Sequence, residues 1–558
     1  MYNLHRFLID YDMAMLRALA HKRGIVLRSN RQAEVADQLA ADLRDPLSLR
    51  VALAQLSAEA AEALTALQAA GGRMRVPQFA RRFGQVRPIG PGRLEREALW
   101  QEPANPTEEL WYAGLIFRAF AQDQGGPGEF FFVPDDLRPL LPQPPSGPPP
   151  FEVETVPAPP SLDEEPGLVE DLFAYLVYIQ THDVRPYADG RLGRRDLAAL
   201  ARRLAVQDER RLVFLRHLAR RLGFVVRREG FLRLAAAPVK GWLTAPAARR
   251  TAILQEAWRD DPTWNDLCHV PGLICDQEPV WQNDPLLTRR ALLDLLARCP
   301  ADEWWTASSF LSAVKRTNPD FQRPDGDYRS WYLRDAASGE YLSGFESWER
   351  VEGTLIFDLL AGPLRWLDVV RSVPQGQDRL CCLTEAGARF LGLLPAPPEE
   401  PPAPPIAVQP DFRVVIPPPA SLYTRFQLER FADLEATEPC TYRLTVAGLG
   451  RVLARGIDVE QILSFLRQAS GDTLPANVVG QFRLWAGRFG QVEIEEVALL
   501  RVKSERVLKE LSVLPETRTL IARFLSPTTA LVRRENLPRL RKELRKLGFL
   551  PPERLSGK

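Results

Sequence analysis

The sequence predicts a mainly helical, multidomain α+β protein with small β-hairpins and sheets. Three observations predict this class. Apolar residues recur at helical spacing through most of the chain, short alternating runs occur in hairpin-like pairs, and two proline-dense stretches interrupt the rest. A chain of 558 residues with 45% apolar and 26% charged residues is long enough for several globular domains.

Residues 1–45 predict a pair of short amphipathic helices. The first helix carries Leu16 and Leu19 on one face and ends at Gly24, and the second carries Leu39. The pair resembles a SAP motif, a small DNA-binding helical hairpin, with one extra residue in the turn. A plain hairpin that caps the next domain explains the pattern equally well, because any two short amphipathic helices share it.

Residues 46–141 predict three helices followed by a late strand. Helical periodicity runs over residues 47–72, a second helix is expected at residues 76–84, a third begins near Pro91, and residues 129–133 favour a strand. This order resembles a winged helix, a three-helix bundle with a small hairpin. In that fold the third helix can enter the major groove of DNA.

Proline marks two boundaries. Residues 134–166 hold twelve prolines, a density that excludes a core helix or strand, so residues 142–166 are interpreted as an extended linker. A second proline-dense stretch, PAPPEEPPAPP at residues 395–405, separates the C-terminal part of the chain.

Two further winged-helix-like units are expected between these linkers. Residues 167–236 read as three helices, the third basic, and a hairpin that turns at Glu229 and Gly230. Residues 237–394 form a tryptophan-rich region with a second such unit at about 285–394. Nine of the twelve Trp residues lie between positions 242 and 366. They could stack on unpaired bases, but core packing is the commoner use of this side chain.

The stretch after residue 405 carries the most specific pattern. A strand with period-two apolar residues is followed by the series L-T-x-x-x-L-x-x-x-L-x-x-G-I, I-L-x-F-L and L-P-x-N-V-V-x-Q-x-R-L-W. This series resembles the N-terminal domain of the XPB/Ssl2 DNA helicases and of bacterial helicase-associated proteins. The family's histidine after F-L is absent; Gln468 and Ser470 occupy that region. The matched positions are Leu444, Thr445, Leu453, Gly456, Ile457, Ile462, Phe465, Leu466, Pro475, Val479, Gln481 and Trp485.

The resemblance places an XPB/Ssl2 N-terminal-like domain at residues 406–502. The run QVEIEEVALLRV is expected to return strands to this domain. Residues 503–558 then predict a basic C-terminal helical segment, two helices around a short strand, with Leu540 and Leu544 facing inward.

No sequence motif for catalysis is recognised. A helicase motor needs a Gly-rich loop ending in Lys-Ser/Thr and an acidic pair for Mg²⁺, yet the only Gly-Lys is Gly557-Lys558. The five His residues form no triad. Cys268, His269 and Cys275 come nearest to a metal site but have the wrong spacing. The sequence therefore predicts no enzymatic activity, no cofactor and no metal.

Positive charge is concentrated in two segments although the net charge is only +1. Residues 185–233 hold fourteen Arg against five acidic residues, and residues 501–558 hold fifteen Lys or Arg against six. Such local fields can bind phosphate, although charge runs are usually solvated helix faces. The candidate DNA-binding residues are Arg194, Arg195, Arg210, Arg211, Arg220, Arg221, Arg541, Lys542, Arg545 and Lys546.

Taken together, these features predict a non-catalytic, DNA-binding accessory protein associated with a helicase in DNA repair or transcription. Its expected partners are duplex DNA and a helicase or another repair or transcription protein. The alternative is a protein-interaction scaffold whose winged helices are docking surfaces without DNA contact. With no run of eighteen apolar residues and a charged N-terminus, the chain is expected to be cytoplasmic, where it could associate with the nucleoid, and away from membranes.

Overall fold

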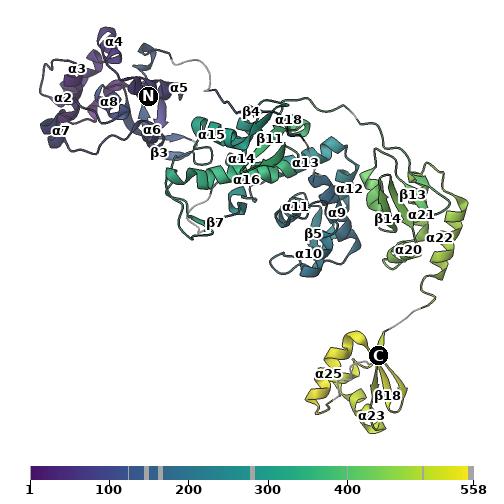
Figure 1. Cartoon of the computed structure of the whole chain (residues 1–558). Helices are drawn as coiled ribbons and strands as arrows, with labels where there is room; N and C mark the ends of the chain where they lie inside the picture. The colour runs from purple at the N-terminus through teal and green to yellow at the C-terminus, as the bar shows by residue number, and fades with distance from the viewer. Residues whose placement is uncertain are drawn as a thin grey trace. The chain divides into compact units, whose positions relative to one another are not determined.

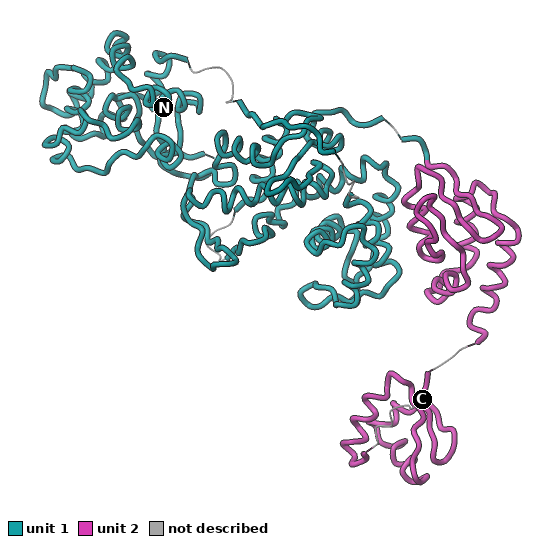
Figure 2. Tube along the Cα trace, in the orientation of Figure 1, with its two compact units in different colours: residues 1–402 teal, residues 403–558 magenta. Residues whose placement is uncertain are grey.

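The structure is a computed structural model that describes residues 2–123, 125–143, 150–160, 167–276, 283–398, 400–492 and 496–550 (Figure 1). The chain divides into two compact units, Met1–Pro402 and Ala403–Lys558 (Figure 2). The division lies inside the second proline-dense stretch. Both units are α+β, with small antiparallel sheets among many helices, as the sequence predicts.

The first 141 residues share one hydrophobic core. Leu16 and Val35 from the predicted N-terminal helix pair lie in it together with Phe79 and Phe117, so the pair is packed against the elements of residues 46–141. Asn3 and Asp12 cap the first two helices with their side chains. The helices are α1 Leu4–Ile9, α2 Met13–Lys22, α3 Gln32–Asp42, α4 Pro46–Ala54, α5 Ala58–Ala69, α6 Val76–Phe83, α7 Pro91–Glu97 and α8 Pro106–Tyr112.

A three-stranded antiparallel sheet completes this part. Its order is β1-β3-β2, so the first strand pairs with the last. Phe131 and Phe132 of the third strand are buried because this strand lies in the middle of the sheet. The strands are β1 Arg73–Arg75, β2 Phe117–Asp123 and β3 Gly126–Phe132.

The next segment has three helices and a hairpin, in the order that the sequence predicts. The hairpin turns at Glu229 and Gly230, which both have positive φ, as a two-residue type I′ turn requires. Asp208 caps the third helix through the N–H groups of Arg210 and Arg211. The elements are α9 Leu168–Thr181, α10 Arg194–Ala201, α11 Glu209–Arg221, β5 Val225–Arg228 and β6 Phe231–Leu234.

The tryptophan-rich region packs around a four-stranded sheet of order β10-β11-β8-β4. A separate two-stranded pair joins β7 Leu273–Cys275 to β9 Leu333–Asp335. The remaining elements are α12 Ala236–Thr244, α13 Ala247–Arg259, the 3-10 helix η2 Asp266–His269, α14 Pro285–Leu296, β8 Trp304–Thr306, α15 Ala307–Thr317, η3 Phe345–Ser347, the π-helix η4 Glu349–Gly353, α16 Thr354–Ala361, α17 Pro363–Trp366, β10 Val370–Gln375, β11 Asp378–Leu383 and α18 Glu385–Phe390.

The fourth strand of this sheet comes from the first proline-rich stretch. Strand β4, Thr155–Val156, pairs antiparallel with β8 at Trp304 and Trp305. Phe151 packs edge-on against Phe310, with ring centroids 5.6 Å apart. The segment 150–160 is therefore attached to the sheet. Residues 144–149 and 161–166 of the predicted linker lie outside the described residues.

The second unit begins with a four-stranded sheet of order β12-β13-β15-β14, packed against helices. Val414, Tyr442, Leu463, Val478 and Phe482 form the centre of its core. The elements are β12 Ala407–Val408, β13 Arg413–Val415, α19 Leu422–Leu428, β14 Ala432–Thr437, β15 Cys440–Leu444, α20 Val446–Leu453, α21 Val459–Ala469 and α22 Ala476–Arg488.

Residues 496–550 form a further small fold with its own core of Leu511, Leu520, Val532, Leu540 and Leu544. Its sheet order is β16-β18-β17. The expected return of strands to the preceding domain differs from the structure: β16 pairs with β18. The elements are β16 Val497–Arg501, α23 Glu505–Val513, α24 Pro515–Arg518, β17 Arg523–Ser526, β18 Thr529–Arg533, η5 Arg534–Asn536 and α25 Leu537–Lys546.

Candidate nucleic-acid interface

The six candidate arginines of the first unit do not lie on one surface. Arg211 is only 2% exposed, and its Nε donates to the Asp171 carboxylate at 2.7 Å. The other Asp171 oxygen accepts from the Ala205 N–H at 2.7 Å. Burial lowers the pKa of Arg211, and Asp171 opposes this effect. Arg211 therefore links α11 to α9 inside the core, where it cannot reach a phosphate.

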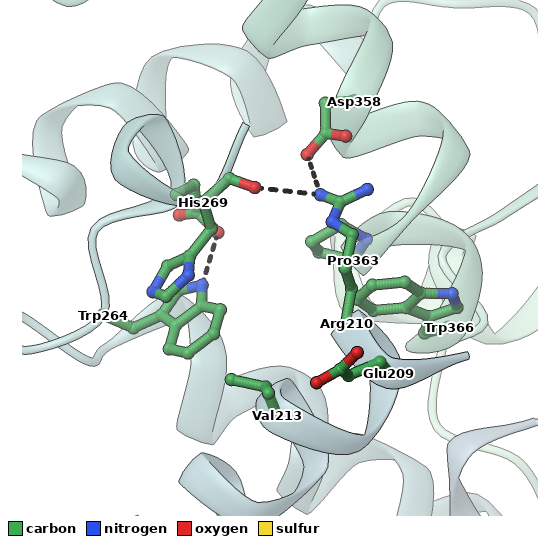
Figure 3. Close-up of a pocket in the computed structure, with 9 residues that line it drawn as sticks. Glu209, Arg210, Val213, Trp264, His269, Asp358, Pro363 and Trp366 are labelled. Carbon is green, nitrogen blue, oxygen red and sulfur yellow. Dashed lines mark hydrogen bonds and ion pairs between the residues drawn. The ribbon is translucent and has the colours of Figure 1, made fainter. Parts of the chain in front are cut away.

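Arg210 is held by residues of η2 and α16. Its guanidinium donates to Asp358 at 2.7 Å and to the His269 carbonyl at 3.1 Å (Figure 3). The guanidinium also lies 6.0 Å from the centroid of the Trp366 ring. Burial raises the pKa of Asp358, and the hydrogen bond from Arg210 opposes this. Arg210 is thus engaged within the protein.

The C-terminal end of α11 is engaged in the same way. Arg221 donates to the Asp260 carbonyl at 3.4 Å and lies 3.6 Å from an Asp261 carboxylate oxygen. The helix packs against α9, α13, α17 and β5. An α-helix surrounded on these sides cannot enter a groove of DNA as a whole. Three of the six candidate arginines are exposed and form no ion pair among the described residues, namely Arg194, Arg195 and Arg220.

Helix α25 brings the four C-terminal candidates together. Leu540 and Leu544, one turn apart, face the core, so the charged residues between and beside them face outward. All four are exposed: Arg541, Lys542, Arg545 and Lys546. Lys546 pairs with Glu543 at 2.9 Å.

These four cations line an open groove of about 760 Å³. Arg534, Leu537 and Pro538 complete its lining, which contains no acidic side chain from the residues that the structure describes. Arg534 was not predicted from the sequence because it lies in η5, outside the helical repeat of the candidate residues. It pairs with Glu496 from the residue before β16. The groove concentrates donors of a single charge sign, which suits a phosphate backbone.

The predicted metal candidates do not form a cluster. Cys275 and Cys268 are hydrogen-bonded, which raises the pKa of the Cys275 thiol, while the His269 ring stacks on Trp264 at 3.7 Å. Within the described ranges, no group of three or more His, Cys, Asp or Glu side chains could hold a metal ion.

The tryptophans are largely packing residues. Trp242, Trp258, Trp305 and Trp348 are fully buried. Trp281 lies outside the described residues. In the part of the chain that the structure describes, no helix is both long and apolar enough to cross a bilayer.

Residues 406–525 match the family model of the helicase conserved C-terminal domain. The match covers the β12–β15 sheet with α20, α21 and α22, and it continues into the small C-terminal fold as far as β17. No protein of curated function matches the chain. The second unit therefore contains a stretch similar to a helicase domain, and the residues of the basic groove follow the matched residues in the sequence.

Proposed function

We propose that this protein is a non-catalytic nucleic-acid-binding accessory protein of a helicase, acting in DNA repair or transcription. The observation that carries the proposal is the groove on α25, which follows a helicase-type domain and presents five cations without an acidic lining residue. The proposal keeps the XPB/Ssl2 N-terminal-like domain that the resemblance predicts at residues 406–502, except that β16 belongs to the small C-terminal fold. The protein would work in the cytoplasm, at the nucleoid.

We further propose that the protein contains several winged-helix units. A repeated topology supports this: a strand, helices and a hairpin, with the first strand paired to the last. The orders β1-β3-β2, β8-β11-β10 and β16-β18-β17 all follow it. The segment at residues 167–236 has the helices and hairpin, and the Val184 carbonyl accepts from the Leu232 N–H where a first strand would lie. These units would present basic edges to nucleic acid.

The groove would contact backbone phosphates. Each phosphate that a Lys or Arg neutralises releases condensed counterions, so log affinity falls with log salt by roughly 0.9 per contact on duplex DNA. Such contacts position the protein without reading sequence. The proposed complex is therefore sensitive to salt and nearly indifferent to sequence.

The test is fluorescence anisotropy of labelled duplex DNA over a salt series with the full chain. Arg541→Ala with Lys542→Ala should lower the salt slope by roughly 1.8, which is two contacts. Lys503→Ala with Arg506→Ala is the matched control, because both residues are exposed on the same small fold and outside the groove. A groove variant with the slope of the wild type would overturn the proposal.

A protein-interaction scaffold is the second candidate function. The observation in its favour is that three arginines of α11 already form ion pairs within the protein. These pairs are Arg210–Asp358, Arg211–Asp171 and Arg221–Asp261. A recognition helix that binds DNA keeps such side chains available. Absence of salt-sensitive binding to duplex or single-stranded DNA, with retained pull-down of a helicase from the native cell, would favour the scaffold.

A further inference from the structure

A cavity of about 260 Å³ lies in the first unit beside the N-terminal half of α11 (Figure 3). Helix α11 contributes one wall, the residues around η2 contribute the opposite wall, and α16 and α17 close the third side. The lining residues are Glu209, Arg210, Val213, Trp264, Asp266, His269, Asp358, Pro363 and Trp366.

One half of this cavity already holds a guanidinium. Arg210 donates to the Asp358 carboxylate at 2.7 Å, and its guanidinium lies 6.0 Å from the Trp366 ring centroid. A carboxylate and an indole together are a favourable environment for a cation, because the first supplies charge and the second a negative π face. Arg210 thus shows that a guanidinium can bind between a carboxylate and an indole in this cavity.

The other half repeats these groups without a cation. The Glu209 carboxylate points into the cavity (Figure 3), and it joins no ion pair or hydrogen bond among the described residues. Opposite it stand the stacked rings of Trp264 and His269, with an interplanar angle of 7°. Val213 supplies the apolar floor between them.

The remaining charges of the lining are already balanced. Asp266 is paired with the buried Arg289 at 2.7 Å, and Asp358 is paired with Arg210. Burial lowers the pKa of His269, so its ring is neutral at neutral pH and does not repel a cation. Among the described lining residues, Glu209 is therefore the one charge without a partner of opposite sign.

We propose that the open half of this cavity binds a cationic side chain, arginine or lysine, of a partner protein. The carboxylate of Glu209 would pair with the cation, and the Trp264–His269 wall would cover its flat or apolar part. The volume is just below that of drug-sized ligand sites, which suits a single side chain. A nucleotide is disfavoured because its phosphate would approach the Glu209 carboxylate, and two negative groups repel each other. The inference does not depend on nucleic-acid binding at α25.

The experiment uses the full chain labelled with 5-fluorotryptophan and observed by fluorine NMR. Trp264→Phe and Trp366→Phe assign the two resonances of the cavity. The probes are N-acetylarginine amide and N-acetyllysine amide, and the neutral control is N-acetylcitrulline amide, which has nearly the shape of the arginine probe. The cationic probes should shift the Trp264 resonance saturably with a Kd in roughly the millimolar range, as expected for one side chain, and citrulline should bind at least about tenfold more weakly.

Two variants test the role of the carboxylate. Glu209→Gln should weaken the arginine probe by about tenfold or more, whereas Glu209→Asp, which keeps the charge, should retain part of the affinity. Glu303→Gln is the matched control, because Glu303 is also exposed and unpaired in the described part of the chain but lies outside the cavity.

Three results would overturn the inference. They are equal binding of citrulline and arginine, no effect of Glu209→Gln, and no saturable shift of the Trp264 resonance at about 50 mM probe, far above the expected Kd. If guanosine monophosphate caused a saturable shift of the Trp264 resonance and the arginine probe did not, the cavity would be a nucleotide site. The Arg541→Ala and Lys542→Ala substitutions should leave these NMR binding measurements unchanged. The cavity proposal and the DNA-binding proposal can therefore be refuted independently of each other.

Discussion

Replacing Arg289 by methionine is expected to loosen the core beneath the cavity. The Arg289 guanidinium is almost fully buried and donates to the Asp266 carboxylate at 2.7 Å and to the carbonyls of Trp258 and Asp261, both at 2.6 Å. The other Asp266 oxygen accepts from the indole N–H groups of Trp258 and Trp264 at 3.1 and 3.0 Å. Methionine has a similar length but offers no donor, so it leaves a buried carboxylate without its cation.

The loss can be bounded from this geometry. Removing one partner of a buried ion pair costs about 3–5 kcal/mol, and we expect water to enter the space left by the smaller, donor-free side chain and to hydrogen-bond the freed carbonyls. The indole donors to Asp266 remain, which places the expected loss at about 4 kcal/mol. At roughly 1.4 kcal/mol per factor of ten, amides protected by this region should exchange about a thousandfold faster.

Hydrogen exchange followed by mass spectrometry is the suitable assay, because a chain of several folds has no single unfolding free energy. Peptides from α13 and α14 report the local opening. Arg290→Met is the matched control: the neighbouring residue is exposed, so its replacement should change the opening free energy by less than about 0.5 kcal/mol. Equal protection in the two variants would show that the buried network does not stabilise this region.

The two units, the missing motor motifs and the buried thiols each lead to a further prediction. A Glu-specific protease should cut at the exposed Glu400 and release a stable C-terminal unit; a protected Glu400 would contradict the division after Pro402. Steady-state ATP hydrolysis with and without DNA should stay at background, and DNA-stimulated turnover by the pure protein would refute a non-catalytic role. Burial raises the pKa of Cys299 and Cys381 to about 12, so alkylation at pH 8 should be slower there than at the partly exposed Cys440, and equal rates would contradict the burial. Because these folded-state pKa values exceed the unfolded value near 8.5, their stabilisation is complete below about pH 8.5 and is lost as pH rises toward 12.

Local features of the fold were predictable from the sequence. The hairpin turn depends on two adjacent residues, Glu229 and Gly230, and it occurs where the sequence places it. The inward face of α25 was predictable for the same reason, since Leu540 and Leu544 are one turn apart.

Features that depend on distant partners were not predictable. Arg211 differs from its neighbours on α11 only because Asp171, forty positions earlier, lies against it in the core. Strand β16 carries the same alternation whether it pairs with the preceding domain or with β18. Glu209 and Asp358 belong to one cavity only through the packing of α11 beside α16 and α17. Neither the spacing of apolar residues nor the composition of the sequence predicts contacts between such distant residues.

Strand β4 also sets the order in which the first unit can assemble during synthesis. Among the described strand pairs, β4–β8 joins the most distant residues: Thr155 pairs with Trp305, whereas in the next most distant pair, β8–β11, Trp305 pairs with Cys381. Thr155 cannot form its strand pairing until Trp305 has been synthesised. The intervening chain, which includes α9 to α14, is then closed into one loop whose entropic cost grows only with the logarithm of its length. Strand β4 can therefore dock only after the residues of α9 to α14 have been synthesised.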